Sequence, residues 1–287
     1  MKKISPTDLI LNEDGSVYHL NLLPKHIPDT IIAVGDPSRV YNVSRYFDDV
    51  EFEMNKREFI TNVGKYNGKR IAVISTGIGT DNIELFFTEL DALVNIDLKT
   101  REPKSRRRRL KVIRIGTSGA LQEDIPLDCH LVSDYAVGFD NLMNFYNLPM
   151  SKYEREISKS IHVASGVPLP PYVVQASGLL MERIGVDMIR GNTVTTPGFY
   201  APQGRQVRIP LKFPKLLDDL NRYHHRESNF WLTNFEMETA GYYAMARLMG
   251  HEVLSVNAII ANRIKNKFSK NPNKAVDTLI RKVLERI

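Results

Sequence analysis

Cysteine is almost absent from this sequence, because Cys129 is the only one in 287 residues. A single cysteine excludes an internal disulfide framework and is typical of proteins from a reducing compartment. No stretch approaches the roughly 18 to 20 apolar residues of a membrane helix. No apolar run that would indicate a signal peptide follows the basic pair at the start. We therefore expect a cytoplasmic protein in which Cys129 is a small buried residue.

Several motifs of metal-binding and catalytic proteins are missing too. The sequence has no CxxC or HExxH pattern, and His224 and His225 are adjacent, so their side chains are expected to point apart. The nucleophile elbow of serine hydrolases is also absent. The glycine-rich segments 77–82 and 116–120 lack the spacing of a dinucleotide fingerprint and the lysine of a P-loop. We expect no metal site.

The net charge of +6 is compatible with nucleic-acid binding, but its distribution argues against it. The densest basic run, KSRRRRLK at 104–111, has no interleaved aromatic residues that could stack on bases. We interpret this run as a solvated loop and expect neither a nucleic-acid nor a membrane partner. A docking patch for RNA or a membrane is the alternative; a salt-dependent gel shift abolished by replacing Arg106 to Arg109 would support it.

Short apolar runs alternate with longer segments of helical periodicity. Strand-like runs lie at 30–35, 69–77, 111–119, 129–137 and 253–263. Helical spacing of apolar residues occurs at 81–98, 237–250 and 273–287. This alternation predicts an α/β fold with a largely buried sheet, whose ligands bind where strands end. With neither a repeat nor a low-complexity linker, we expect one domain over residues 1–287.

Two arginines stand where an anion could bind. Arg39 closes the segment Gly35-Asp36-Pro37-Ser38-Arg39, in which a glycine turn lets backbone amides approach an anion. A tight turn with a surface arginine is the alternative. Arg114 lies inside an apolar strand, followed by the possible donors Thr117 and Ser118, and a buried arginine needs a carboxylate or an anionic ligand. Structural pairing of Arg114 with Asp or Glu stays open.

Two further segments carry groups suited to a sugar and a base. Glu236 and Glu238 suit the dipole at the start of the segment 237–250. Being two residues apart, they are expected to point in different directions, so that one could accept hydrogen bonds from two vicinal hydroxyls. The loop 196–205 offers an aromatic ring, an amide and a guanidinium, which can stack on a base and bind its polar edge. Loops also carry such residues by chance.

Together these segments resemble the nucleoside phosphorylase superfamily, and the uridine phosphorylases in particular. The shared motifs are YHLNL (18–22), GDPSRV (35–40), KREF (56–59), STGIG (75–79), RIGTSGALQ (114–122), GFYAPQGR (198–205), NFEMET (234–239) and ANR (261–263). Each is short, but their order and spacing span most of the chain. The resemblance implies a three-layer phosphorylase/hydrolase-like α/β fold with a mixed central sheet flanked by helices.

The resemblance also implies a role for each site residue. Phosphate would be bound by Gly35, Arg39, Arg114 and Thr117, together with Arg57 from a neighbouring subunit. Ribose would contact His19 across the same interface, Thr117, Met237 and Glu238, the last holding the 2′- and 3′-hydroxyls. The base would contact Phe199, Gln203, Arg205 and Arg263. The implied catalytic residues are Arg39, Arg114, Gln203 and Arg205.

The sequence departs from the family pattern in three places. Thr80-Asp81-Asn82 stands where many relatives have Gly-Pro-Ser, and Asn82 leaves the interface cation site of some members unassigned. The base loop reads Ala-Pro-Gln-Gly-Arg, where better-known bacterial members have Pro-Gly-Gln-Glu-Arg. The basic stretch 99–110 looks like an insertion with no assigned role.

The implied reaction is phosphorolysis of uridine by inorganic phosphate to uracil and ribose 1-phosphate, as part of nucleoside catabolism and pyrimidine salvage. It needs no cofactor, because phosphate is the nucleophile, and it implies a homo-oligomer with shared sites, built from dimers and extending in some members to a hexamer. Purine-specific relatives carry an aspartate near Arg263, and its absence favours a pyrimidine. The alternatives are a purine nucleoside phosphorylase, a phosphate-independent nucleosidase of the same fold, or a non-catalytic nucleoside-binding protein.

Overall fold

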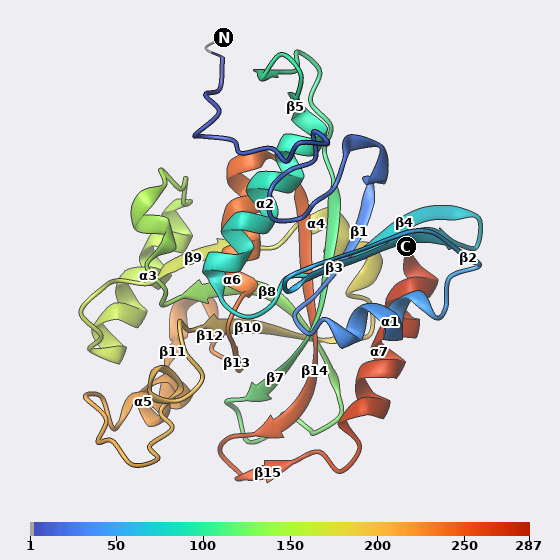
Figure 1. Ribbon diagram of the computed structural model, residues 1–287. Helices are drawn as coiled ribbons and strands as arrows, with labels where there is room; N and C mark the ends of the chain where they lie inside the picture. Colours follow the sequence, from blue (N-terminus) through green and yellow to red (C-terminus); the bar gives the residue numbers. More distant parts are fainter. Residues whose placement is uncertain (1–2) are drawn as a thin grey trace.

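The computed structural model describes residues 3–287, in which helices flank a mixed eleven-stranded β-sheet (Figure 1). The strands of this sheet are β1 (Thr30–Val34), β2 (Asp49–Lys56), β3 (Phe59–Tyr66), β4 (Lys69–Ser75), β7 (Lys111–Ala120), β8 (His130–Gly138), β9 (Tyr172–Gln175), β10 (Ile189–Thr195), β13 (Asn234–Glu236), β14 (Glu252–Asn262) and β15 (Lys267–Phe268). Two short ribbons pair β5 (Ile96–Asp97) with β6 (Glu102–Pro103) and β11 (His224–His225) with β12 (Phe230–Trp231). The helices are α1 (Ser38–Ser44), α2 (Thr80–Asn95), α3 (Lys152–Ser165), α4 (Gly178–Ile184), α5 (Leu216–Arg222), α6 (Thr239–Met249) and α7 (Pro272–Arg286).

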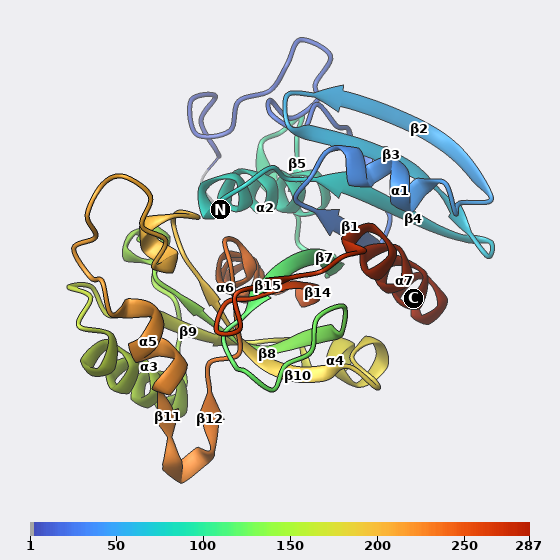
Figure 2. The same cartoon turned by 90° about the horizontal axis from the view of Figure 1, so that it is seen from below.

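The sheet is the middle of three layers, as β1 illustrates. Successive side chains of a strand point to opposite faces. Ile31 and Ala33 pack into the apolar core that α2 and α6 cover, whereas Ile32 and Val34 pack into the core beneath α1, α4 and α7. Figure 2 shows these two helical layers on opposite sides of the strands. The three-layer α/β fold expected from the sequence is therefore confirmed.

Part of the sheet closes on itself. Strand β14 runs parallel to β7 on one side and antiparallel to β8 on the other. The pairings of β8 with β10, β10 with β13 and β13 with β7 complete a ring of five strands. Strand β7 also pairs with β1, so Arg114 has Ala33 and Ser255 as its cross-strand neighbours. The ring brings the carboxyl-terminal halves of the parallel strands β7 and β14 together, with the antiparallel strand β13 beside the end of β7.

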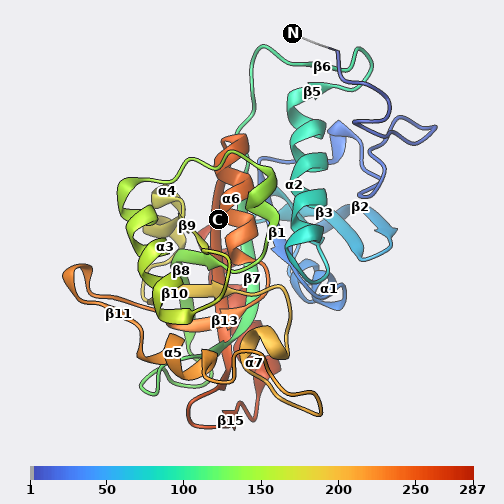
Figure 3. The ribbon, with the colours of Figure 1, turned by 90° about the vertical axis from the view of Figure 1, so that its left-hand side faces the viewer.

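Helices α2 and α6 lie side by side over one face of the sheet (Figure 3). Their close approach depends on Gly241 of α6, because a Cβ atom there would lie 2.9 Å from the Cγ2 atom of Thr80. Helix α6 ends at Met249 and is followed by Gly250, whose φ of 78° is the left-handed conformation of a C-cap. The glycine C-cap predicted from the sequence is confirmed.

Other elements were not predicted. Helix α3 begins with a capping box between Ser151 and Glu154, and β2 and β3 form a hairpin whose first strand is largely exposed.

The basic run is exposed at 105–109, as expected of a solvated loop. Two of its arginines pair with acidic residues, Arg108 with Asp29 and Arg109 with Glu252. Within residues 3–287, no helix has the length and apolar composition needed to cross a membrane.

Candidate active site

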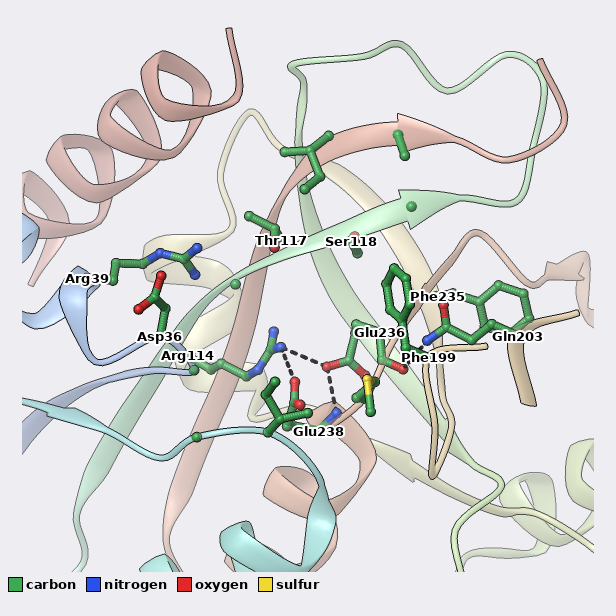
Figure 4. Close-up of a pocket in the computed structure, with 18 of the residues that line it drawn as sticks. Asp36, Arg39, Arg114, Thr117, Ser118, Phe199, Gln203, Phe235, Glu236 and Glu238 are labelled. Carbon is green, nitrogen blue, oxygen red and sulfur yellow. Dashed lines mark hydrogen bonds and ion pairs between the residues drawn. The ribbon is translucent and has the colours of Figure 1, made fainter. Parts of the chain in front are cut away.

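A cavity of about 730 Å³ opens where β1, β7, β13 and β14 end (Figure 4). The residues that line it are Gly35, Asp36, Pro37, Arg39, Glu58, Gly77, Ile78, Asn82, Arg114, Gly116, Thr117, Ser118, Gly119, Phe199, Gln203, Arg205, Phe235, Glu236, Met237, Glu238, Ile260, Ala261 and Phe268. Figure 4 shows Arg39 and Asp36 at one end of the cavity, with Phe199 and Gln203 at the other. The sequence segments 35–39, 114–119, 198–205 and 236–238 thus meet in one place.

Arg114 is held by polar groups from β14 and from the start of α6. Its Nη1 donates to Ser255 Oγ at 3.2 Å and to Asn257 Oδ1 at 3.0 Å. Its Nη2 lies 2.9 Å from Glu236 Oε2 and 2.7 Å from Glu238 Oε2. Burial alone would lower the pKa of Arg114, but these two carboxylates raise it. The carboxylate pairing that the sequence left open is therefore present, in a wall of the cavity.

Gly116 makes this arrangement of Arg114 possible. A Cβ atom at position 116 would lie 2.1 Å from Arg114 Nη1 and 2.8 Å from Asn257 Oδ1. Any side chain there would therefore displace the guanidinium. Gly116, two residues after Arg114 in the motif, is therefore needed for the packing of the guanidinium as well as for access to the end of the strand.

Glu236 and Glu238 converge, and the expectation that they point in different directions is wrong. Glu236 is the last residue of β13 and Glu238 directly precedes α6, so helical side-chain geometry does not apply to either. Glu236 accepts hydrogen bonds from the backbone amides of Glu238 and Thr239 and from Thr195 Oγ1. It therefore satisfies amides at the start of α6 while it binds Arg114.

Glu238 carries the second carboxylate of this cluster. Its Oε1 accepts a hydrogen bond of 2.9 Å from the amide of Gly79, and its Oε2 faces Arg114. Burial raises the pKa of Glu238, with the charge of Glu236 acting in the same direction and Arg114 opposing both. The carboxylate lies between the two ends of the cavity, beside Met237.

Arg39 differs from Arg114 in having no carboxylate within ion-pair distance among residues 3–287. The only hydrogen bond of its side chain in that part of the chain is a long one, 3.5 Å from Nη1 to the carbonyl of Ile115. Burial lowers the pKa of Arg39, although Asp36 and Glu238 nearby act against that shift. The guanidinium of Arg39 is thus free to bind an anion at this end of the cavity, next to the Gly35 turn and Thr117.

The opposite end of the cavity is built from one loop. Arg205 places its guanidinium 3.8 Å from the ring centroid of Phe199 and hydrogen-bonds to Gln203 Oε1. Buried Gln203 is held by a hydrogen bond of 3.0 Å from its Nε2 to Thr196 Oγ1. Burial, together with the nearby charge of Arg263, lowers the pKa of Arg205 to about 10. An aromatic face, an amide and a guanidinium are therefore presented together.

Three residues assigned by the resemblance do not line the cavity of this chain. Arg263 lies behind the loop and donates to the carbonyl of Gln203 at 3.0 Å, so its contact is with the loop. Arg57 is exposed in the turn between β2 and β3, with a φ of 55°. His19 is hydrogen-bonded through Nδ1 to Glu89 at 2.7 Å. Roles for Arg57 and His19 across a subunit interface remain predictions.

Some lining residues have no role implied by the resemblance. The sequence indicates Glu236 and Ser118 only as possible polar groups of a site, and Phe235 only as part of the motif NFEMET. Phe268 on β15 pairs with Ala261 on β14 and is 74% exposed. No sequence motif indicates Phe268 as a lining residue. Its position depends on the turn that follows β14.

Two sets of potentially reactive groups lie away from the cavity lining. Glu156, His225 and Glu227 bring their ligand atoms within 4.8 Å of one another at the surface, although both glutamates are exposed. Cys129 is partly buried, and burial raises its pKa to about 11. Its thiol is therefore protonated at neutral pH, in line with a packing role.

Comparison with known proteins agrees with this geometry. Residues 29–287 match the family model described as "Phosphorylase superfamily". A uridine phosphorylase of Thermococcus kodakarensis is 29% identical over 261 residues, which cover 90% of this chain and 82% of the relative. A DeoD-type purine nucleoside phosphorylase of Colwellia psychrerythraea is 25% identical over 242 residues, covering 83% of this chain and 84% of the relative.

A solved structure extends the agreement to three dimensions. The nucleoside phosphorylase of Trypanosoma brucei, whose crystal structure is described as showing uridine phosphorylase activity, superposes with a TM-score of 0.90 at 28% identity. The match covers 97% of this chain and 99% of that one. The chain belongs to the phosphorylase superfamily. Within it, the protein is a nucleoside phosphorylase, an enzyme of the pentosyltransferase class.

Proposed function

We propose that the protein is a uridine phosphorylase, which cleaves uridine with inorganic phosphate to uracil and ribose 1-phosphate. The observation that carries this proposal is a single cavity with the free guanidinium of Arg39 at one end and the Phe199, Gln203 and Arg205 loop at the other. The uridine phosphorylase activity named for two similar proteins supports the choice of base. No cofactor is needed, because phosphate itself attacks C1′.

Phosphate binds at the Arg39 end. The Gly35 turn offers backbone amides and Thr117 a hydroxyl, while Arg39 contributes a forked cation. Arg114 already binds two carboxylates and two neutral oxygens, so it contributes chiefly by fixing the wall of the site. Holding the phosphate in line with C1′ turns an encounter into an aligned attack.

The sugar and base occupy the remainder of the cavity. Glu238 accepts hydrogen bonds from the ribose 2′- and 3′-hydroxyls, and Met237 packs against the sugar. As the glycosidic bond lengthens, the ribose becomes oxocarbenium-like and negative charge grows on the departing uracil. Gln203 and Arg205 stabilise that charge, which is strongest in the transition state.

Two residues complete the site from a neighbouring subunit. Arg57 adds a second free cation at the phosphate, and His19 reaches the ribose 5′-hydroxyl. Both lie outside the cavity lining of their own chain, which supports a contribution to another copy. The proposed enzyme is therefore a homo-oligomer in which each dimer holds two reciprocal sites.

A nucleoside panel with and without phosphate tests the proposal. We expect free uracil and ribose 1-phosphate from uridine only when phosphate is present, as measured by chromatography. Release of base without phosphate would indicate a nucleosidase, and binding without any release would contradict the proposed activity. Deoxyuridine, thymidine and 5-substituted uridines belong in the panel, because the cavity alone does not distinguish them.

A purine nucleoside phosphorylase is the second candidate, because DeoD-type purine enzymes are also similar to this chain. Inosine and adenosine in the same panel separate the two candidates. A kcat/KM for either purine nucleoside above that for uridine would favour the purine enzyme.

A further inference from the structure

A row of buried polar side chains crosses four neighbouring strands and ends in the wall of the cavity. Ser133 on β8, Thr193 on β10, Asn234 on β13 and Ser118 on β7 supply one member each. The first three are 0% exposed and Ser118 is 5% exposed. Buried hydroxyl and amide groups cost free energy unless every one is hydrogen-bonded. Apolar side chains would fill the same space without that requirement.

The hydrogen bonds of this row run in one direction. Thr193 Oγ1 donates to Asn234 Oδ1 at 3.0 Å, and Asn234 Nδ2 donates to Ser118 Oγ at 2.9 Å. A hydroxyl carries only one hydrogen, so Thr193 must accept from Ser133, whose Oγ lies 2.5 Å away. At the end of the row, the Asn234 amide therefore donates a hydrogen bond to Ser118 from the protein interior.

Ser118 is left with one unused hydrogen. Its Oγ accepts from Asn234 and has no other side-chain hydrogen bond among residues 3–287. The residue lines the cavity between Thr117 and Phe235 (Figure 4). The hydroxyl hydrogen is thus available to an acceptor inside the cavity. An Asn234 amide turned by 180° would take that hydrogen and leave only lone pairs for the ligand.

We propose that Asn234 is a positioning residue, which makes the Ser118 hydroxyl a hydrogen-bond donor to an oxygen atom of the nucleoside. This inference rests on the proposed function, in which the cavity holds a nucleoside beside phosphate. Asn234 does not touch the substrate, because it acts through Ser118. The buried row fixes the amide orientation on which the direction depends.

Steady-state kinetics on purified variants tests this role. Ser118→Ala is expected to raise KM for uridine about tenfold, the value of one neutral hydrogen bond, with a smaller effect on kcat. Ser118→Thr retains the hydroxyl and is expected to retain KM. Asn234→Asp is expected to raise KM as well, because a carboxylate only accepts and so takes the Ser118 hydrogen. The double variant Asn234→Asp/Ser118→Ala is expected to have the same KM for uridine as Ser118→Ala alone.

A matched control separates positioning from stability. Thr233 Oγ1 lies 2.8 Å from Asn234 Oδ1, so Thr233→Val removes a neighbour of the amide without touching Ser118. This variant is expected to lower the melting temperature and leave KM unchanged. If the Asn234→Asp chain does not fold, Asn234→Ser replaces it, because the shorter side chain cannot reach Ser118.

Two results would overturn the inference. One is an unchanged KM for uridine in Ser118→Ala. The other is a rise in KM on changing Asn234 that is as large in the Ser118→Ala background as in the wild type. The wild-type enzyme tests the proposed function separately. If it releases no uracil from uridine and phosphate, the proposed function fails, and the same variants are then assayed with the nucleoside that it does cleave.

Discussion

At the scale of single residues, Arg39 and Arg114, two of the arginines that line the cavity, differ in their surroundings. Arg114 binds Glu236 and Glu238 inside the protein, whereas Arg39 has no carboxylate within ion-pair distance among residues 3–287. The first is therefore part of the structure that holds the site together, and the second is available to a ligand. Substituting each should affect different properties of the enzyme.

Arg39→Ala should weaken phosphate binding with little effect on folding. Hydrogen bonds to a charged group contribute about 1.5–3 kcal/mol, so KM for phosphate is expected to rise roughly 10- to 100-fold. The melting temperature should stay close to that of the wild type, because no buried carboxylate loses a partner. Initial rates at varied phosphate concentration measure the effect, and an unchanged KM would remove Arg39 from the phosphate site.

Arg114→Met should mainly destabilise the protein. It leaves two buried carboxylates without a counter-charge, and breaking a buried pair in this way costs about 3–5 kcal/mol. Urea denaturation measures the loss of unfolding free energy. Adding Glu236→Gln to Arg114→Met should recover part of it, because one uncompensated charge disappears. No recovery would mean that the loss comes from packing alone.

Arg205→Ala tests the base end of the cavity. Removing one donor to a developing negative charge costs about 2.7–4 kcal/mol of barrier, so kcat/KM for uridine should fall roughly 100- to 1,000-fold. The fold should be intact, because the side-chain contacts of Arg205 are confined to its own loop. Arg205→Lys keeps the charge but not the forked geometry, so its kcat/KM should lie between those of the wild type and Arg205→Ala. A near-normal kcat/KM in Arg205→Ala would contradict the proposal that Arg205 contacts the base.

At the scale of elements, the helical contact at Gly241 can be tested directly. Replacing glycine by alanine in a helix usually stabilises it by about 1 kcal/mol. Here the new methyl group would lie 2.9 Å from Thr80 Cγ2, so Gly241→Ala should instead destabilise the protein by about 1–3 kcal/mol. Thermal melting measures this. Thr80→Ser removes the Cγ2 atom and should recover part of the loss in the double variant.

The strands that the sequence predicts share one property, which is burial on both faces over most of their length. The runs that became β1, β4, β7, β8 and β14 are apolar because both faces of these strands are covered. The sequence does not predict the hairpin of β2 and β3. Strand β2 is exposed along much of its length and lacks such a run, and the run of the buried strand β3 is interrupted by Thr61, Asn62 and Gly64. A strand buried on both faces has an apolar run in its sequence, whereas a strand at the edge of the sheet does not.

For the site, the sequence predicts the residues next to strand ends but not their partners. The pattern indicates that Arg114 is a buried cation, yet whether it binds a carboxylate or a ligand depends on β13 and α6, which lie more than 100 positions away in the chain. The convergence of Glu236 and Glu238 depends on the helix starting at Thr239 rather than earlier. Asn234 reaches Ser118 only through the pairing of β13 with the distant strand β7, and Phe268 reaches the cavity through the turn between β14 and β15.

At the scale of the whole molecule, shared sites can be tested by mixing subunits. If each site takes Arg39 from one subunit and Arg57 from the other, a hybrid of Arg39→Ala and Arg57→Ala chains holds one intact site and one doubly altered site. The hybrid, purified with two affinity tags after co-expression, should then have about half of the wild-type activity, and an unfractionated random mixture about a quarter. Pairing Arg39→Ala with Glu238→Ala is the control, because both changes affect a subunit's own site and no recovery is expected.

The closed ring of five strands has a consequence for how the enzyme becomes active during synthesis. Arg114 on β7 is bound by Ser255 on β14, 141 positions later in the chain. Until β14 is inserted, β7 and β8 each have an unpaired edge, which can pair with other chains. Contacts so distant in sequence also make folding slow. A nascent chain therefore cannot hold Arg114 and the cavity wall in order until its last strands arrive, and it is most prone to aggregation just before it becomes an enzyme.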